Sequence, residues 1–383
     1  MPRSVHIQEF GKAGPLAATR PLFTPYRMGD LDRSNRIVMA PLIRTRAGSD
    51  DHVPSAEQAE YYAQRATAGL IVTEGVAISP EGFGWADTPG PWTEEQVRGW
   101  RRVTDAVQAV GGRIVAQLWH TGAMPHPDLR GGALPVSASD VDPEQRSVTA
   151  AGRVPTVPLR PITRDEIRQT VADYARAARN AMRAGFDGVQ IQANYLYLRA
   201  QFLSKATNRR TDKYGGEIEG RARFLFEVVE AILGDVEPAK VGVKIGPMHK
   251  TGPFAANDET LPMAEYAIRE LSGYGLSHLL IMGNTTGFTG TPLEPLMGDG
   301  MFRHFRPMFR GTLIANTEHD CGARQPPDRR EPCRPRRLWP ALHRQSGPRR
   351  APEDRRPTRR DRQDDSLCLR ARGLFRLPGA AAG

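Results

Sequence analysis

Short apolar, β-branched runs recur along the first 316 residues, and an amphipathic stretch follows several of them. The runs that predict buried strands are 36–40, 69–74, 113–119, 186–191, 240–245, 277–282 and 311–315. They are almost continuously apolar, which is typical of strands covered on both faces in a parallel sheet. Helical spacing marks the segments 94–110, 164–184, 220–233 and 261–274. Thr163, followed by Arg-Asp-Glu, predicts the N-cap of the second of these helices.

The alternation of strands and helices predicts the α/β class, and within it a (β/α)8 TIM barrel rather than two Rossmann halves. Seven candidate strands spread over about 280 residues, and no G-x-G-x-x-G motif follows the first strand. In such a barrel the chemistry belongs to the C-terminal ends of the strands. The polar and aromatic candidates on or after these strands are Gln117, Trp119, His120, Gln192, Asn194, Tyr195, Tyr197 and Lys244.

Composition divides the chain into two parts. Hydrophobic residues make up 39% and charged residues 25%, a composition that argues against a wholly disordered protein. No apolar run reaches the roughly 18 residues of a membrane span and the N-terminal segment lacks the apolar stretch of a secretory signal, so we expect a cytoplasmic protein. The net charge of +10 first suggests nucleic-acid binding, but residues 317–383 hold 17 arginines against nine acidic residues. Residues 1–316 therefore carry only +2.

Several motifs, in one order, resemble the old yellow enzyme family of FMN-dependent NAD(P)H oxidoreductases. They stand here as Asn35-Arg-Ile-Val-Met-Ala-Pro-Leu42, Glu60-Tyr-Tyr-Ala-Gln-Arg-Ala66, Thr73-Glu-Gly75, Gln117-Leu-Trp-His120, Thr207-Asn-Arg-Arg-Thr-Asp-Lys-Tyr-Gly-Gly216, Arg221-Ala-Arg-Phe224 and Thr312-Leu-Ile-Ala-Asn316. The resemblance covers roughly residues 20–316. It implies a barrel that holds FMN, takes hydride from NADH or NADPH, and passes it to an electron-poor alkene, a nitro compound or a similar small-molecule acceptor.

The resemblance also implies which residues hold the cofactor. They are Ala40, Pro41, Leu42, Gly75, Gln117, Lys244 and Asn316. A glutamine amide both donates and accepts, which suits the pyrimidine edge of a flavin. Lys244 stands where the family usually has arginine; it keeps the charge near flavin N1 and O2 but lacks the planar fork. Ile43 replaces the family's threonine, whose hydroxyl would contact flavin O4, or is simply a packing residue.

The substrate residues depart further from the family pattern. Tyr197 aligns with the proton donor, and a positioned phenol can act as a general acid. Gln192 stands in place of a histidine and Tyr195 in place of an asparagine, so Gln192, Asn194, Tyr195 and Trp119 are the residues expected to line the substrate pocket. For both tyrosines, aromatic packing at the barrel mouth is the alternative interpretation. His120 is interpreted as a neighbour of the pocket, and no His/Cys/Asp cluster has metal-ligand spacing.

The resemblance stops at Asn316, where the family expects a phosphate-binding loop, a helix and an eighth strand. Reading a GC-rich back-translation of residues 338–350 one base later permits A-F-G-R-P-F-I-A-N-P-D-L-V-E, the family's ending for that strand. We therefore hypothesise a one-base insertion or deletion near the codon for Thr317. The chain would then consist of an FMN-binding barrel domain over 1–316, with an extension at 1–20, and a disordered, frameshifted Arg/Pro-rich tail over 317–383. Such a barrel lacks a proper eighth strand, and its phosphate affinity should fall.

Alternatives remain for the tail and for the whole chain. The tail could be a native solvated extension or, as a distant third interpretation, a nucleic-acid-binding segment, although no aromatic residues are interleaved to stack on bases. Its cysteines, Cys321, Cys333 and Cys368, lack zinc-site spacing. The alternative function is a catalytically inactive remnant whose basic tail binds polyanions non-specifically. A homo-oligomer is left open, and no membrane partner is expected.

Overall fold

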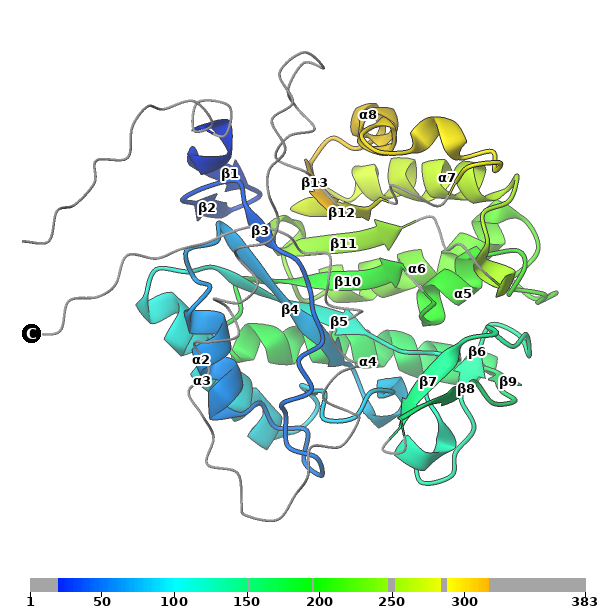
Figure 1. Ribbon diagram of the computed structural model, residues 1–383, viewed down its shortest axis with the longest axis horizontal. Coiled ribbons are helices and arrows are strands. Elements are labelled where there is room, and N and C mark those ends of the chain that lie inside the picture. The colour runs from blue at the N-terminus through cyan, green and yellow to red at the C-terminus, as the bar shows by residue number, and fades with distance from the viewer. Residues whose placement is uncertain (1–19, 150–151, 195, 247–251, 284–287, 317–383) are drawn as a thin grey trace, which may run out of the picture.

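Seven parallel strands form one sheet, a nearly closed barrel, and Figure 1 shows these strands side by side. The computed structural model describes residues 20–149, 152–194, 196–246, 252–283 and 288–316. The sheet order is β13-β12-β11-β10-β5-β4-β3, all pairs parallel. The strands are β3 (Val38–Met39), β4 (Leu70–Ala77), β5 (Ile114–Trp119), β10 (Gly188–Asn194), β11 (Val241–Gly246), β12 (His278–Met282) and β13 (Thr312–Asn316). All seven predicted strands are confirmed, with ends within three residues of those expected.

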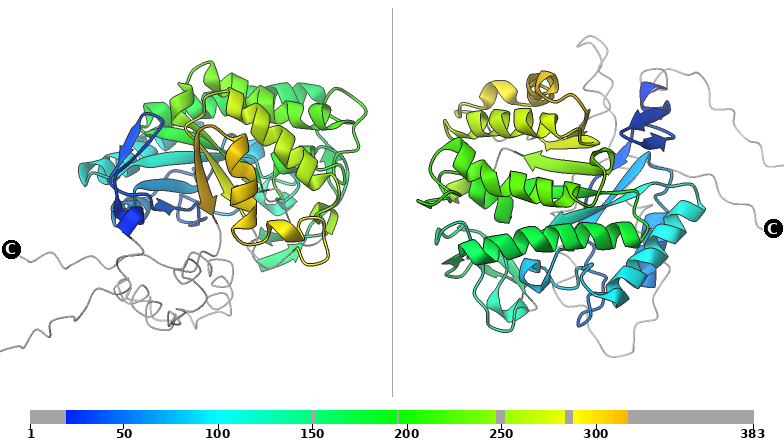
Figure 2. Two further views of the ribbon diagram at one scale, coloured as in Figure 1. Left: turned by 90° about the horizontal axis from the view of Figure 1, so that it is seen from above. Right: turned by 180° about the vertical axis from the view of Figure 1, so that it is seen from behind.

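Helices cover the outer face of this sheet, as the views from above and from behind show (Figure 2). They are α2 (Ala56–Ala63), α3 (Glu94–Ala109), α4 (Arg164–Arg183), α5 (Leu198–Leu203), α6 (Ile218–Leu233), α7 (Thr260–Gly273) and α8 (Gly300–Phe305). Short 3-10 helices lie at Arg20–Phe23, Pro80–Gly82, Pro127–Leu129, Pro238–Lys240, Gly252–Phe254, Glu294–Leu296 and Arg306–Met308. The four predicted helices are confirmed as α3, α4, α6 and α7.

The predicted N-cap of α4 is also confirmed. The Thr163 hydroxyl accepts a hydrogen bond from the Glu166 N–H at 3.2 Å, and the Glu166 carboxylate accepts one from the Thr163 N–H at 2.8 Å. This reciprocal pair is a capping box, which satisfies two N–H groups that have no partner inside the helix.

The fold of the described residues is a TIM barrel that lacks one strand. Strands β3 and β13 form the two edges of its sheet.

Side chains of the strands alternate between the helix-facing core and the barrel interior. On β10, Val189, Ile191 and Ala193 belong to the large hydrophobic core, whereas Gln190, Gln192 and Asn194 alternate with them and are also buried. Because the period of a strand is two residues, the second set points to the opposite face, the barrel interior. The sequence pattern alone did not separate these two sets, since both faces are buried.

A small hairpin covers the N-terminal end of the barrel. It consists of β1 (Tyr26–Met28) and β2 (Leu31–Arg33), and Met28 packs with Leu70, Val72 and Val115 from the starts of β4 and β5. The Tyr26 hydroxyl lies 3.0 Å from the Thr312 hydroxyl of β13, which ties the hairpin to one edge of the sheet. The apolar bottom of the barrel leaves the opposite end for polar groups.

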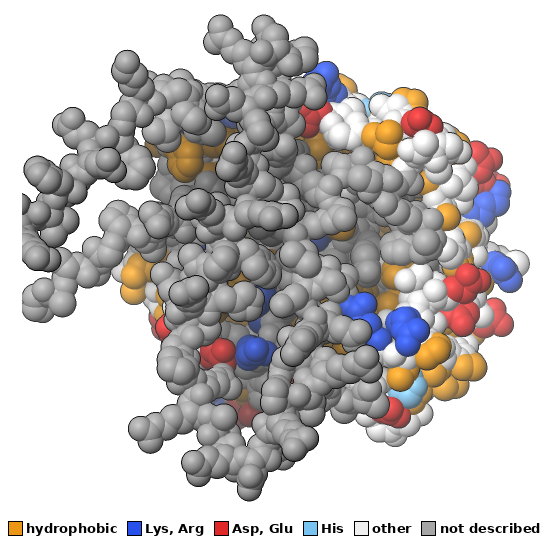
Figure 3. All heavy atoms as spheres, viewed as in Figure 1, with side chains coloured by type: hydrophobic (Ala, Val, Ile, Leu, Met, Phe, Trp, Pro, Cys, Tyr) orange, Lys and Arg blue, Asp and Glu red, His pale blue; other side chains and the backbone are white. Residues whose placement is uncertain are grey.

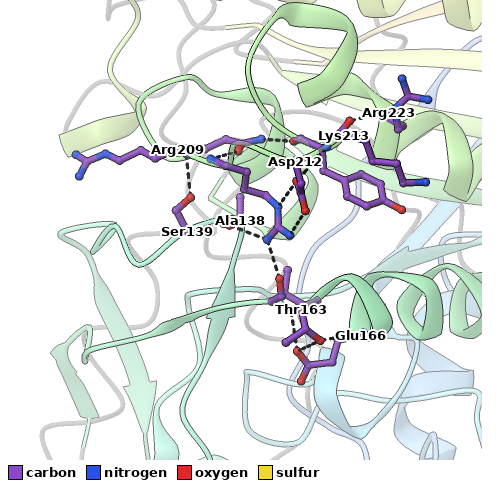
Figure 4. A network of polar contacts seen from close by, with 12 residues as sticks. Ala138, Ser139, Thr163, Glu166, Arg209, Asp212, Lys213 and Arg223 are labelled. Atoms are coloured by element: carbon purple, nitrogen blue, oxygen red, sulfur yellow. Dashed lines mark hydrogen bonds and ion pairs between the residues drawn. The ribbon is translucent and has the colours of Figure 1, made fainter.

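The motif Thr207–Gly216 is a structural clamp. The Arg210 guanidinium donates two hydrogen bonds to Asp212, at 2.9 and 2.6 Å, and two more to the carbonyls of Ile162 and Ala138. Figure 4 shows the polar contacts around Asp212 and Ala138. An open hollow of about 320 Å³ is lined by these loops. Since Arg210 and Asp212 pair with each other, they fasten loops rather than converge on a ligand. The remaining small sheets are β6 (Val136–Ser137) with β9 (Arg160–Pro161), and β7 (Arg146–Thr149) with β8 (Gly152–Pro155).

The described surface mixes both signs of charge. Figure 3 shows the face seen in Figure 1, and in the part of it that is coloured by side-chain type, Lys and Arg lie next to Asp and Glu. Within the residues that the structure describes, none of the helices combines the length and apolarity needed to cross a bilayer.

Candidate functional site

Three predicted side chains lie on three neighbouring strands, toward the C-terminal end of the barrel. Gln117 lies on β5, Gln192 on β10 and Lys244 on β11, each less than a tenth exposed. The register pairs Gln192 with Lys244, and pairs Gln117 with Gln190, two residues before Gln192. By strand alternation all of them face the barrel interior. The sheet therefore places Gln192 and Lys244 at one mouth, where the fold class places chemistry, and Gln117 one layer below them.

Lys244 is a buried cation without a counterion in the described part of the chain. It is 7% exposed, and none of the described residues forms a hydrogen bond or ion pair with its ammonium group. Burial lowers the pKa of Lys244 to about 8. A buried charge is normally paired, because its desolvation costs several kcal/mol or more. Lys244 is therefore suited to an anionic group that the barrel takes up.

Two amide oxygens on β10, those of Gln192 and Asn194, also lack a hydrogen-bond partner among the described residues. The side chain of Gln192 forms no hydrogen bond with any described residue, and its Oε1 is fully buried. Asn194, at the end of β10, donates to the Met282 sulfur at 3.1 Å, and its Oδ1 has no described partner. Buried polar atoms of this kind are rare in folded proteins and point to an absent partner such as a ligand.

Aromatic side chains form one wall of the mouth. Trp119 at the end of β5 packs edge-on against Tyr197, with ring centroids 4.9 Å apart. A Cβ placed on Gly75 would lie 2.4 Å from the Trp119 ring, so only glycine fits beneath this indole. Ile43 packs against the same cluster, and Tyr197 is the N-cap residue of α5 and 6% exposed. Gly75 thus makes room for Trp119, a role that the sequence did not indicate.

The other predicted positions lie around this mouth or outside the described residues. Ala40, Pro41 and Leu42 follow β3 directly and are partly buried. Asn316 ends β13, and its carbonyl accepts the Gly283 N–H at 2.9 Å. Tyr195, like the tail over 317–383, lies outside the described residues. His120 is buried, and its Nδ1 accepts the Gly122 N–H at 3.1 Å. Burial, with Arg130 and Arg199 nearby, lowers the pKa of His120 to about 3, so the ring is neutral.

Sequence reasoning missed Glu74, a fully buried carboxyl group next to Gly75. Its oxygens accept hydrogen bonds from the Arg44 N–H at 2.9 Å, the Gln58 amide at 2.7 Å and the Tyr62 hydroxyl at 3.3 Å. Glu74 therefore fixes the segment after β3 and the helix α2 onto β4. Burial outweighs these hydrogen bonds and raises the pKa of Glu74 to about 7. The signal was an acidic residue inside an otherwise apolar strand run.

Arg199 on α5 was also missed. It is 1% exposed, donates to the carbonyls of Gln192 and Leu118, and lies with its Cζ 4.2 Å from the centre of the Tyr174 ring. Its Nε and Nη1 have no hydrogen-bond partner among the described residues, and no described carboxylate pairs with it. An arginine on a short helix is normally solvent-exposed, so the sequence carried no signal for this burial.

The raised pKa of Glu74 makes stability depend on pH in a defined direction. The folded pKa of about 7 exceeds the reference value of 4.5, so stability from this group is full below pH 4.5 and is lost as pH rises through 7. We expect unfolding free energies of the parent chain, relative to Glu74→Gln, to fall by about 3 kcal/mol across this range. Denaturant titrations at several pH values measure it. The exposed control Glu95→Gln should show no such trend, and parallel pH profiles for the parent chain and Glu74→Gln would contradict the prediction.

Replacing Arg199 by an apolar side chain should stabilise the fold. Arg199→Leu removes a buried guanidinium with two nitrogens that have no hydrogen-bond partner among the described residues, and we expect the free energy of unfolding to rise by about 1–3 kcal/mol. Arg199→Lys keeps a buried charge and should not stabilise. Denaturant unfolding at fixed pH compares the two variants with the parent chain. A loss of stability in Arg199→Leu would show that the two carbonyl contacts outweigh the cost of burial.

Comparisons with known proteins show the family to which the chain belongs. The sequence profile of the NADH:flavin oxidoreductase / NADH oxidase family matches residues 21–279. The chain is 37% identical over 317 residues to 12-oxophytodienoate reductase 1 of Oryza sativa subsp. japonica, an alignment that covers 79% of this chain and 78% of the relative.

Two solved structures share the fold. An old yellow enzyme homologue from Zymomonas mobilis matches with a TM-score of 0.73 and 38% identity, over 78% of this chain and 83% of the other. Morphinone reductase matches with a TM-score of 0.72 and 40% identity, over 79% and 80%. With a family profile that spans more than half of its length, this chain belongs to the NADH:flavin oxidoreductase / NADH oxidase family, that of the old yellow enzymes.

Proposed function

We propose that the chain reduces an electron-poor alkene, a nitro compound or a similar small molecule at the barrel mouth, with NADH or NADPH as the source of hydride and Tyr197 as the proton donor. The family's cofactor is FMN, which when bound takes hydride from the nicotinamide and delivers it to the acceptor. The observation that carries the proposal is the Lys244 ammonium group, which has no partner among the described residues and lies on the strand next to Gln192, with Gln117 on the strand beyond. The chemistry of this set fits the pyrimidine edge of a flavin.

Each side chain has a stated task in this proposal. Lys244 would neutralise negative charge at the N1–O2 edge of the ring, and Gln117 would exchange hydrogen bonds with the adjacent N3–O2 edge. Gln192 can donate its amide N–H to the carbonyl or nitro oxygen of an acceptor, which polarises the conjugated bond. The buried Trp119 and Leu196 beside Tyr197 limit water near the phenol.

The reduction of an alkene needs one hydride and one proton. The hydride adds to the carbon that is β to the activating group, and the Tyr197 hydroxyl would give its proton to the α carbon and regain one from solvent. Gln192 stays neutral throughout, since an amide cannot carry the charge that a histidine can carry at this position. We therefore expect slower turnover of carbonyl-activated alkenes than a histidine would support.

The tail determines how tightly the cofactor is held. The described residues supply groups for the ring, and the frameshift hypothesis predicts loss of the family's phosphate contacts after Asn316. Restoring the reading frame from the codon for Thr317 onward should tighten the FMN dissociation constant by 100-fold or more, or roughly 3 kcal/mol, because two or more charged hydrogen bonds return. Flavin-fluorescence titration of both chains measures it. Equal, tight binding would contradict the hypothesis, and no binding by either chain would favour the alternative of an inactive remnant.

The role of Tyr197 can be tested by measuring two half-reactions separately, the reduction of the flavin by NADPH and the reduction of the alkene by the flavin. In the frame-restored chain loaded with FMN, Tyr197→Phe should slow alkene reduction by about 10²- to 10⁴-fold. Bleaching of the flavin absorbance by NADPH should be unchanged, because that half-reaction transfers no proton from Tyr197. Tyr174→Phe is the matched control: its hydroxyl is buried, has no described hydrogen-bond partner and lies on α4. Stopped-flow absorbance follows each half-reaction, and equal losses in both would assign Tyr197 to packing.

A further inference from the structure

A row of side chains crosses four neighbouring strands below the mouth. The register places Gln117 of β5 opposite Gln190 of β10, Gln190 opposite Gly242 of β11, and Gly242 opposite His278 of β12. Gln117, Gln190 and His278 are each 2% exposed or less. Since residues in one register row lie at one height, their inward side chains form a single layer of the barrel.

Gly242 allows this layer to be continuous. A Cβ at Gly242 would lie 2.1 Å from Cε1 and 2.3 Å from Nε2 of the His278 ring, closer than any real side chain is found. The imidazole therefore lies across the position of Gly242 and reaches the next strand but one. There the Gln190 Nε2 lies 2.9 Å from the His278 Nε2.

The hydrogen bonds of the row run in one direction. The Gln117 Nε2 donates to the Gln190 Oε1 at 2.7 Å, which leaves the Gln190 Nε2 as a donor toward His278. The His278 Nε2 must then accept, and its proton lies on Nδ1, which is 2.8 Å from the Ser277 Oγ. The Ser277 hydroxyl in turn donates to the Val241 carbonyl at 3.0 Å. With the two amides oriented in this way, each donor in the row meets an acceptor only if His278 is neutral and protonated on Nδ1.

We propose that Gln190, His278 and Ser277 are positioning residues that hold the Gln117 amide in one orientation, with its Nε2 turned into the barrel and its carbonyl Oε1 toward the mouth. This deepens the proposed function, on which it rests for the place of FMN beside Gln117. A fixed carbonyl oxygen selects a ring that donates a hydrogen bond, as flavin N3–H does. If the Gln117 amide could rotate freely, some molecules would turn its Nε2–H toward the flavin N3–H, and two donors would then face each other.

The state of His278 supports this direction. Burial, with a smaller contribution from the charge of Arg33, lowers the pKa of His278 to about 3. The ring is therefore neutral at every pH at which an enzyme of this kind would work. Arg33 is itself buried at the base of the barrel. The orientation of the Gln117 amide is consequently independent of pH at every pH well above the pKa of His278.

The first test needs no flavin. In the flavin-free chain with ¹⁵N-labelled histidine and glutamine, NMR should find His278 as the Nδ1–H tautomer, with one Gln117 side-chain proton protected from exchange. Gly242→Ala should displace the imidazole, remove that protection and leave the fold intact. Gly273→Ala, where a Cβ meets nothing within 4 Å, is the matched control and should change neither signal. An Nε2–H tautomer in the parent chain would overturn the proposal.

The second test measures selectivity of the ring site in the frame-restored chain. The parent should bind FMN about tenfold more tightly than N3-methyl-FMN, and this ratio should fall to within about twofold in Gly242→Ala and Gln190→Leu. Gln190→Glu should keep the ratio, since a carboxylate still accepts from Gln117, but should move the His278 proton to Nε2. Retained selectivity in both disrupted variants would refute a positioning role. If no flavin binds, the proposed function fails, and the NMR result alone decides whether the row orients Gln117.

Discussion

The site depends on one constraint, the two-residue period of strands that are buried on both faces. Outward residues such as Ile191 and Val243 must match the helices, so they are apolar, and the inward residues between them fill a closed layer. The barrel interior is apolar at the base, where Met28 of the hairpin packs with Val72 and Val115. Toward the mouth the interior side chains become polar. A shift of one residue in any strand would exchange the two sets, so helix packing and site geometry are maintained by the same register.

Because the interior of the protein has low polarity, burial strongly affects the pKa of each ionisable group there. Glu74 is stabilised by three donors and still has a raised pKa, because burial disfavours its charge more than the hydrogen bonds favour it. Lys244 has no described partner to offset the same effect. The first group organises the protein itself, whereas the second is available to something that enters the barrel. Glu74 and Lys244 differ in their hydrogen-bond partners, which can be found from the structure but not from the residue type.

Local rules predicted the elements well, and the site only in part. Apolar runs located the seven strands, and the Thr163 pattern located a helix start, because these features depend on neighbours in sequence. The motif Gln117–His120 and Lys244 could be placed at strand ends for the same reason. By contrast, the row from Gln117 to His278 depends on which strands are adjacent and in what register, and no local pattern encodes this. Arg199 was missed because tertiary packing buries it against the expectation from its residue type, and the hairpin at the base of the barrel because each of its strands has only three residues.

The neutral row also explains why the charge of Lys244 remains available. Gln190 precedes Gln192 by two residues on β10, and Gln192 is the register partner of Lys244, so position 190 lies one layer below the ammonium group. An ionised carboxylate at position 190 would attract this charge across a medium of low polarity and cancel part of its field at the mouth. An amide accepts from Gln117 equally well, and it adds no charge. A protonated His278 would instead repel Lys244, and burial prevents this as well. In the proposed arrangement this layer holds the Gln117 amide and adds no charge, so that the Lys244 charge, which has no counterion in the described part of the chain, acts on the place where a flavin ring would gain negative charge.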